Sequence, residues 1–87
     1  MTVHHIELSP GAMKDLRRIG DRRLHKRLTD AIGELSSEPR PHGCVKLVGK
    51  ADEWRVRVGD WRIVYRVDDG VLVVLVVTVA PRGGVYR

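Results

Sequence analysis

The spacing of apolar residues changes once along this chain, and that change constrains the fold more than any other feature. Between residues 10 and 35, apolar side chains recur every three or four positions, the period of one α-helix face. From residue 45 to residue 67 they largely alternate with polar residues, the period of a strand with one buried face. The segment between, 36–43, holds two prolines and a glycine and is typical of a loop. Helices followed by a run of strands predict an α+β domain.

Two capping signals divide the helical region into a helical hairpin. Ser9 followed by Pro10 predicts an N-cap and a proline at the first helical position, where its missing N–H costs nothing. We expect Gly20 to end the first helix and Asp21 to cap the second. The two apolar stripes are Ala12, Leu16 and Ile19, then Leu24, Leu28, Ala31, Ile32 and Leu35. Each stripe requires a buried surface to pack against.

The strongest strand signal is a predicted β-hairpin. Strands at 54–58 and 61–67 flank Gly59 and Asp60, a two-residue turn of the Gly-X type. If Val58 pairs with Trp61 across this turn, the apolar and the basic side chains of the two strands fall on opposite faces. One face then carries Trp54, Val56, Val58, Trp61, Ile63, Tyr65 and Val67, and the other carries Arg55, Arg57, Arg62, Val64 and Arg66. We therefore expect both tryptophans to pack in the core rather than stack on bases.

Further strands complete the predicted sheet. Short strands are expected at 4–8 and 45–48, and a three-residue turn with glycine at a positive φ at 68–70. Residues 71–79 show no alternation, as expected for a central strand covered on both faces. The prediction is one α+β domain, 1–87, in which an N-terminal strand and a helical hairpin pack on one face of an antiparallel β-sheet meander. The other face stays open and is lined with arginine.

The charge of the chain points to an anionic partner. Lys and Arg number 16 and Asp and Glu 11, which gives +5 and a pI near 10.0. Residues 14–27 hold seven bases against two acids, and residues 46–67 hold six against three. A small domain this basic is a candidate for binding a polyanion or an acidic protein.

Several other classes of function are disfavoured. One cysteine, Cys44, precludes an internal disulfide and makes a cysteine-based zinc site unlikely; it is expected to be partly buried. The histidines lack metal-ligand spacing and are expected at the surface or in strands: His4, His5, His25 and His42. Residues 1–8 do not resemble a signal peptide, and the longest apolar run, 71–80, is far shorter than the about 20 residues of a membrane helix. We expect a cytoplasmic protein with no metal, no cofactor and no membrane partner.

The arginines of the predicted hairpin favour phosphate binding. The register places Arg57 opposite Arg62, and like charges in that position are unfavourable. A bound polyanion would relieve the repulsion, and arginine presents a flat fork of donors that matches phosphate oxygens. The alternative is that these arginines are merely solvated, as charged residues on a sheet face usually are. Four on one face, with only Glu53 nearby, favours the functional interpretation.

The helices carry a second basic zone, opposite their apolar stripes. Its members are Lys14, Arg17, Arg18, Arg22, Arg23, Lys26 and Arg27. A solvated helix face explains them, and docking on ribosomal RNA or on an acidic partner explains them equally well.

Three segments in order resemble the RelE/ParE family of bacterial toxins, the toxin halves of type II toxin–antitoxin pairs. They are Leu-Val-Gly at 47–49, the stretch Glu-Trp-Arg-Val-Arg-Val-Gly-Asp-Trp-Arg-Ile-Val-Tyr-Arg-Val at 53–67, and Val-Thr-Val-Ala-Pro-Arg-Gly-Gly-Val-Tyr-Arg at 77–87. The order of helices and strands is similar to that of the family over essentially the whole chain.

The resemblance to the RelE branch implies an endoribonuclease that enters the ribosomal A site and cuts mRNA. The ribose 2′-hydroxyl of the message is then the nucleophile, so the protein needs neither serine nor metal and instead positions RNA and neutralises the phosphate. The residues implied to be catalytic are Arg57, Arg62, Arg82 and Tyr86. Those expected to bind RNA are Arg55, Arg66, Lys46, Lys50, Arg17 and Arg22.

This chain departs from the family pattern at three positions. Pro81 replaces a histidine that many members have, Arg57 stands where some have lysine, and Val48 occupies a position that is often basic. Arginine holds its proton, so Arg57 is a poor general base.

The family leaves three functions open. The first is the mRNA endonuclease, favoured by Arg82 and Tyr86; the second is a ParE-like inhibitor of DNA gyrase; the third is an inactive toxin fold that only binds its antitoxin. The implied partners are a cognate antitoxin, in a toxin–antitoxin hetero-oligomer, and the ribosome with its mRNA.

Overall fold

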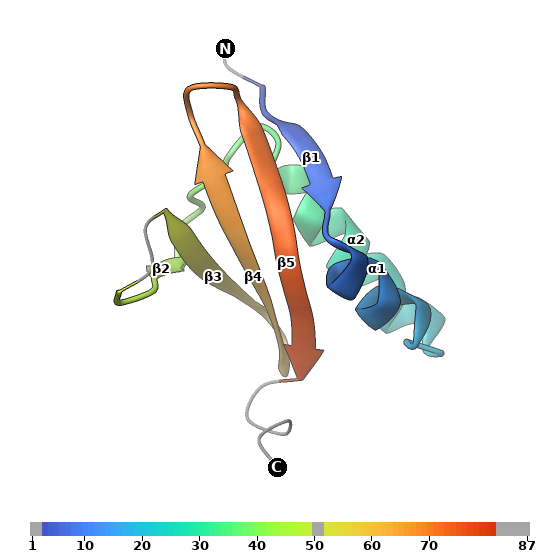
Figure 1. Cartoon of the computed structure of the whole chain (residues 1–87). Coiled ribbons are helices and arrows are strands. Elements are labelled where there is room, and N and C mark those ends of the chain that lie inside the picture. The colour runs from blue at the N-terminus through green and yellow to red at the C-terminus, as the bar shows by residue number, and fades with distance from the viewer. Residues whose placement is uncertain (1–2, 50–51, 82–87) are drawn as a thin grey trace.

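The computed structural model describes residues 3–49 and 52–81. The elements in chain order are β1 (His5–Leu8), α1 (Pro10–Arg17), α2 (Arg22–Glu34), β2 (Val45–Lys46), β3 (Glu53–Val58), β4 (Trp61–Asp68) and β5 (Val73–Pro81). The strands form one sheet in the order β1-β5-β4-β3-β2 (Figure 1). None of the described helices is long and apolar enough to cross a membrane.

Both predicted helix caps are confirmed. The Ser9 hydroxyl accepts a hydrogen bond from the Ala12 amide at 3.0 Å, with Pro10 at the first helical position. The Asp21 carboxylate accepts from the amides of Arg23 and Leu24 at 2.9 and 3.2 Å. These bonds satisfy N–H groups that have no partner inside a helix. Helix α1 ends at Arg17, so the prediction that Gly20 ends it was wrong by nearly one turn.

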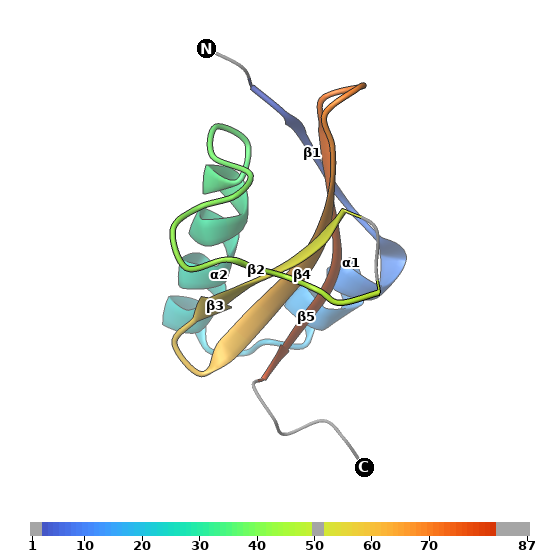
Figure 2. The same ribbon diagram turned by 90° about the vertical axis from the view of Figure 1, so that its left-hand side faces the viewer.

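The antiparallel meander is confirmed for β2 to β5, and the N-terminal strand completes a mixed sheet. Strand β1 lies parallel to β5, with Ile6 opposite Val74 and Leu8 opposite Val76. The helices and the long loop after them form the connection that returns the chain from one edge of the sheet to the other (Figures 1 and 2). Parallel pairing requires such a crossover, because a tight turn can only join antiparallel strands.

The predicted hairpin register is also confirmed. Val58 lies opposite Trp61 and Arg57 opposite Arg62, with Gly59 in the turn at a φ of 61°. A positive φ at the first turn position is what the Gly-X hairpin turn demands. All seven residues of the predicted apolar face belong to the core or pack against it.

The lack of alternation in β5 has a different cause from the one expected. Val74 and Val76 are buried, then the register shifts, and the next buried residue is Val79. The irregularity reverses the inward and outward positions, as an inserted residue does in a β-bulge. The expectation that both faces of this strand are covered holds only near its end, where the successive residues Val79 and Ala80 are both buried. Along the rest of the strand it was wrong, because both helices contribute to a single core on one face.

The turn before β5 also differs from the prediction. The strand starts at Val73, and the residue with a positive φ is Leu72 (58°) rather than Gly70. Instead, the Asp68 carboxylate accepts from the amides of Gly70 and Val71 at 2.9 and 3.2 Å, which closes the turn. The Leu72 carbonyl accepts from the His5 amide at 2.8 Å and so ties the turn to β1.

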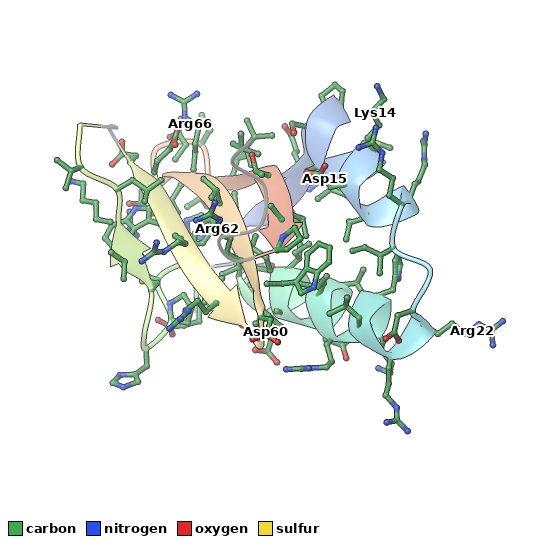
Figure 3. All side chains as sticks on the ribbon, turned by 90° about the horizontal axis from the view of Figure 1, so that it is seen from below. Lys14, Asp15, Arg22, Asp60, Arg62 and Arg66 are labelled. Atoms are coloured by element: carbon green, nitrogen blue, oxygen red, sulfur yellow. The ribbon has the colours of Figure 1, made fainter. Side chains whose placement is uncertain are left out.

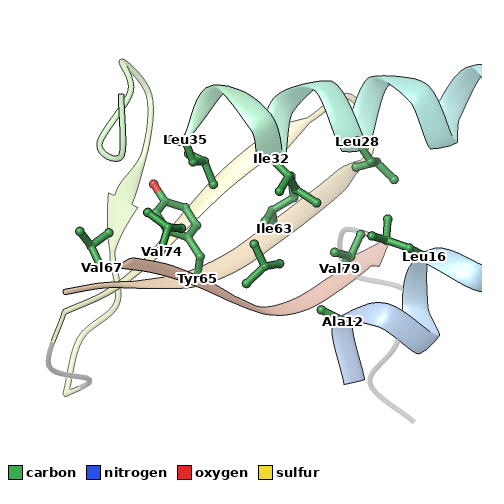
Figure 4. Packing of buried hydrophobic residues seen from close by; sticks show 11 residues of the cluster. Ala12, Leu16, Leu28, Ile32, Leu35, Ile63, Tyr65, Val67, Val74 and Val79 are labelled. Atoms are coloured by element: carbon green, nitrogen blue, oxygen red, sulfur yellow. The ribbon is translucent and has the colours of Figure 1, made fainter. Parts of the chain in front are cut away.

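The core lies between the helices and one sheet face (Figure 4). Leu28, Ile32 and Leu35 of α2 face Ile63 and Tyr65 of β4 in this view. Ala12 and Leu16 of α1 extend the same cluster toward Val79. The helices therefore hold the sheet from behind and leave its other face open.

Helix α1 also covers the sheet edge that β1 is too short to cover. Beyond Leu8, the Ser9 amide donates to the Val76 carbonyl and its hydroxyl donates to the Val77 carbonyl, both at 2.9 Å. The Asp15 carboxylate then accepts from the Val79 amide at 3.0 Å. These bonds satisfy backbone groups that would otherwise form an exposed edge.

Candidate nucleic-acid interface on the open sheet face

The arginine face consists of Arg55 and Arg57 on β3 and Arg62 and Arg66 on β4. Successive strand residues point to opposite sides, and their neighbours on these strands are core residues, so all four lie on the open side. Figure 3 shows Arg62 and Arg66 on the same side of the sheet. Arg57 and Arg66 are exposed, whereas Arg55 and Arg62 are half-buried. The sequence-predicted cluster is therefore brought together.

Two arginines of the arginine face lie opposite each other, and a third forms an ion pair. Arg57 lies directly opposite Arg62, whereas Arg66 lies opposite Glu53 with Nε 3.7 Å from the carboxylate. Asp68 shares this face at the far end of β4, and one of its oxygens accepts hydrogen bonds from the turn amides. Three of the four arginines therefore lie toward the turn end of the hairpin, which also carries the exposed Asp60.

Helix α2 adds a guanidinium to that end, which the sequence did not reveal. A Cβ built on Gly59 would lie 3.1 Å from a terminal nitrogen of Arg27. The sequence predicts Arg27 only as one of the bases opposite the apolar stripe of the helix, because no local pattern links it to a turn more than thirty residues away. The Arg27 guanidinium therefore lies beside the turn between β3 and β4.

Three other predicted RNA contacts are not part of the arginine face. Lys46 lies opposite Trp54 in the β2–β3 register, which places it on the side of the sheet that the helices cover. Arg17 and Arg22 are exposed on the helices. Figure 3 shows Arg22 projecting from the far end of α2, away from Arg62. Any contact they make with RNA would be separate from that of the arginine face.

The remaining predicted residues, Arg82, Tyr86 and Lys50, lie outside the described residues. The last described residue, Pro81, pairs with Trp61 beside the pair of Arg62 and Ala80. The chain therefore leaves the sheet at the end of β4 that carries Arg62.

A polar cluster at the opposite end of the molecule corrects the expectation for His4. This histidine is buried, with 5% of its surface exposed, and its Nε2 lies 3.1 Å from the Asp69 carboxylate. Arg40 approaches the same carboxylate at 3.0 Å, and its guanidinium also lies 5.2 Å from the centre of the Trp54 ring. Hydrogen bonds from Arg40 and His4 lower the pKa of Asp69 below its usual 3.8. The cluster ties the loop after α2 to β1 and to the β4–β5 turn.

The chemistry of the arginine face suits binding of anions and stabilisation of negative charge. Within residues 3–49 and 52–81, no group of three or more His, Cys, Asp or Glu side chains is placed to hold a metal ion. Burial raises the pKa of Tyr65, the one described tyrosine, and so keeps it protonated inside the core. Guanidinium groups on rigid strands can hold phosphate oxygens at fixed spacing and stabilise charge that develops on them.

Comparison with known proteins identifies similar sequences among type II toxins. Residues 6–86 match the family model described as ParE toxin of type II toxin–antitoxin system. The chain is 30% identical over 82 residues to Toxin RelG of Mycobacterium tuberculosis, with 94% of each chain covered.

Solved toxin structures share the fold. In the RelE–RelB complex of Pyrococcus horikoshii, the similar chain gives a TM-score of 0.82 at 25% identity, covering 95% of this chain and 99% of that one. The isolated RelE toxin of E. coli gives 0.78 at 26% identity, covering 91% and 84%.

Proposed function

This chain belongs to the RelE/ParE family of type II toxins, and on that premise we propose that it is a ribosome-dependent endoribonuclease that cuts mRNA in the A site. The observation that carries the proposal is the pairing of Arg57 with Arg62 on the open sheet face. Two like charges directly opposite each other on neighbouring strands repel, whereas a phosphate bound between them would be held by two forks of donors.

The proposed reaction needs little covalent chemistry from the protein. The 2′-hydroxyl of the message loses its proton as its oxygen attacks the adjacent phosphorus. The bond to the 5′-oxygen breaks as that oxygen takes up a proton, and the products carry a 2′,3′-cyclic phosphate and a 5′-hydroxyl. Arg57 and Arg62 stabilise the extra negative charge on the phosphate oxygens in the transition state. Arg82 and Tyr86 complete the proposed catalytic set, and Arg55 and Arg66 hold the flanking backbone.

The proposed partner in the resting state is a cognate antitoxin. Several similar solved toxins are in complex with an antitoxin, including those of Pyrococcus horikoshii and E. coli. An acidic, partly disordered segment suits an exposed basic face, because it neutralises the arginines and orders as it binds. We expect such a segment to cover Arg62 and so block access of RNA.

The test is cleavage of one message with and without translation. The purified protein should cut mRNA in a translating mixture and leave the same naked RNA largely intact, because a few arginines bind free RNA weakly at physiological salt. An Arg62→Ala, Arg82→Ala double variant is the matched control and should be inactive. Efficient cutting of naked RNA, full activity of the double variant, or inhibition of gyrase supercoiling without mRNA cuts would contradict the proposal.

A further inference from the structure

The open sheet face has a second feature, a hollow of about 430 Å³ beyond the end of the arginine face. Its rim carries three carboxylates and one guanidinium, and its remaining lining is aliphatic. The residues are Glu7, Asp52, Arg66, Val67, Asp68, Val71, Val73 and Leu75. We call it the acidic hollow; it joins β1, β5 and β4, elements whose proximity no local pattern predicts.

The charge of the hollow is opposite to that of the arginine face. Arg66 forms an ion pair with Glu53, whose carboxylate lies 3.7 Å from the Arg66 Nε. Of the three carboxylates, Asp68 accepts hydrogen bonds from the turn amides with one oxygen, and the exposed His5 ring lies 3.8 Å from the Glu7 carboxylate. The hollow therefore attracts cations and repels the phosphates that the arginine face attracts.

The walls of the hollow are held in place by backbone hydrogen bonds. Asp52, at a φ of 56°, accepts from the Val67 amide at 3.0 Å through its carbonyl oxygen. The opposite wall contains Val71, which is 67% exposed next to the strained Leu72. A hairpin tip usually carries polar residues, so an exposed valine beside carboxylates suits an occupant with an aliphatic stem and a charged head.

We propose that the acidic hollow binds a lysine or arginine side chain of the antitoxin while acidic antitoxin residues cover the arginine face. This inference rests on the proposed antitoxin partner, but not on the nuclease activity. Arg62 and Arg66 are four residues apart on β4, about 13 Å at a strand's rise per residue, so one short segment spans both features. Opposite charges at the two ends allow only one direction of binding, which makes the hollow a determinant of antitoxin specificity.

The test measures binding of the cognate antitoxin by calorimetry in the absence of ribosomes. A Glu7→Gln, Asp52→Asn variant should bind the antitoxin at least about tenfold more weakly, with a shallower dependence on salt. Glu34→Gln on α2 is the matched control, because Glu34 is exposed on the helix and remote from the hollow; it should bind as wild type. Thermal melts of the free variants establish that each is folded.

A charge swap identifies the occupant. Glu7→Lys should weaken binding, and one Lys→Glu or Arg→Glu change in the antitoxin should restore it. Unchanged affinity of the Glu7→Gln, Asp52→Asn variant, or failure of every antitoxin reversal to rescue Glu7→Lys, overturns the proposal. So does a variant with wild-type antitoxin affinity but an altered pattern of cut codons, since the hollow would then read RNA. If the protein proves not to be a nuclease, these binding measurements still test the acidic hollow, because they require no cleavage of RNA.

Discussion

Arg57 on β3 lies directly opposite Arg62 on β4, on the face of the sheet that neither helix covers. The pairing opposes two like charges in a region that the core holds rigid from behind. Stability and the proposed function therefore make opposite demands on this pair, and mutation can separate them.

Arg57→Glu should stabilise the free protein while abolishing phosphate binding. The change replaces a like-charge pair by an opposite-charge pair, which is worth roughly 0.2–1 kcal/mol across a sheet. Urea unfolding at low salt measures the gain. The gain should shrink at 1 M salt, where exposed charges are screened; a gain that persists there, or a loss of stability, would exclude this explanation.

Arg62→Ala should lower single-turnover mRNA cleavage on programmed ribosomes by about 10²–10³-fold, the usual cost of one transition-state donor. Arg62→Lys should recover little, because a point charge does not reproduce a two-pronged contact. Arg22→Ala is the control: it should weaken ribosome binding at most and leave the rate of the bound complex unchanged, since Arg22 projects away from Arg62. A wild-type cleavage rate of the Arg62→Lys variant would show that a bidentate contact between Arg62 and the phosphate is not needed.

Asp69 should make stability sensitive to acid. Its pKa is lowered in the folded protein by Arg40 and His4, so its contribution is present above the unfolded value of 3.8 and is lost as pH falls through the lower folded value. Asp69→Asn should therefore lower the urea midpoint at neutral pH and flatten its decline below pH 3.8. Asp30→Asn, which removes an exposed ion pair with Lys26, serves as the control and should change the urea midpoint at neutral pH little, because exposed ion pairs contribute little to stability.

Asp15→Ala should expose the edge of β5. The variant removes the acceptor of the Val79 amide, and hydrogen bonds to charged groups contribute about 1.5–3 kcal/mol. Hydrogen exchange of the Val79 amide should accelerate, with a matching loss in unfolding free energy. Asp15→Asn keeps an oxygen acceptor and should lose less; equal effects of the two variants would show that the hydrogen bond is not what protects this edge.

Local patterns determined much of the fold and the composition of the arginine face. Ser9 and Asp21 predicted both helix starts because their side chains bond amides only two or three residues away. The turn at Gly59 predicted the pairing of Arg57 with Arg62, because a two-residue turn leaves a hairpin one register. Each of these signals depends on neighbours in the chain.

Other features depended on contacts between distant segments, and only the tertiary structure decided them. Three such contacts join residues far apart in the sequence that no local pattern connects. They are the parallel pairing of β1 with β5, the burial of His4 against Asp69 and the proximity of Arg27 to Gly59. The register shift after Val76 explains why β5 shows no alternation in the sequence. At the irregularity the inward and outward positions exchange, and the sequence does not indicate where this happens. The acidic hollow has the same origin. Glu7 lies near Asp68 because the sheet places β1 beside β5, and Asp52 joins them because β3 pairs with β4.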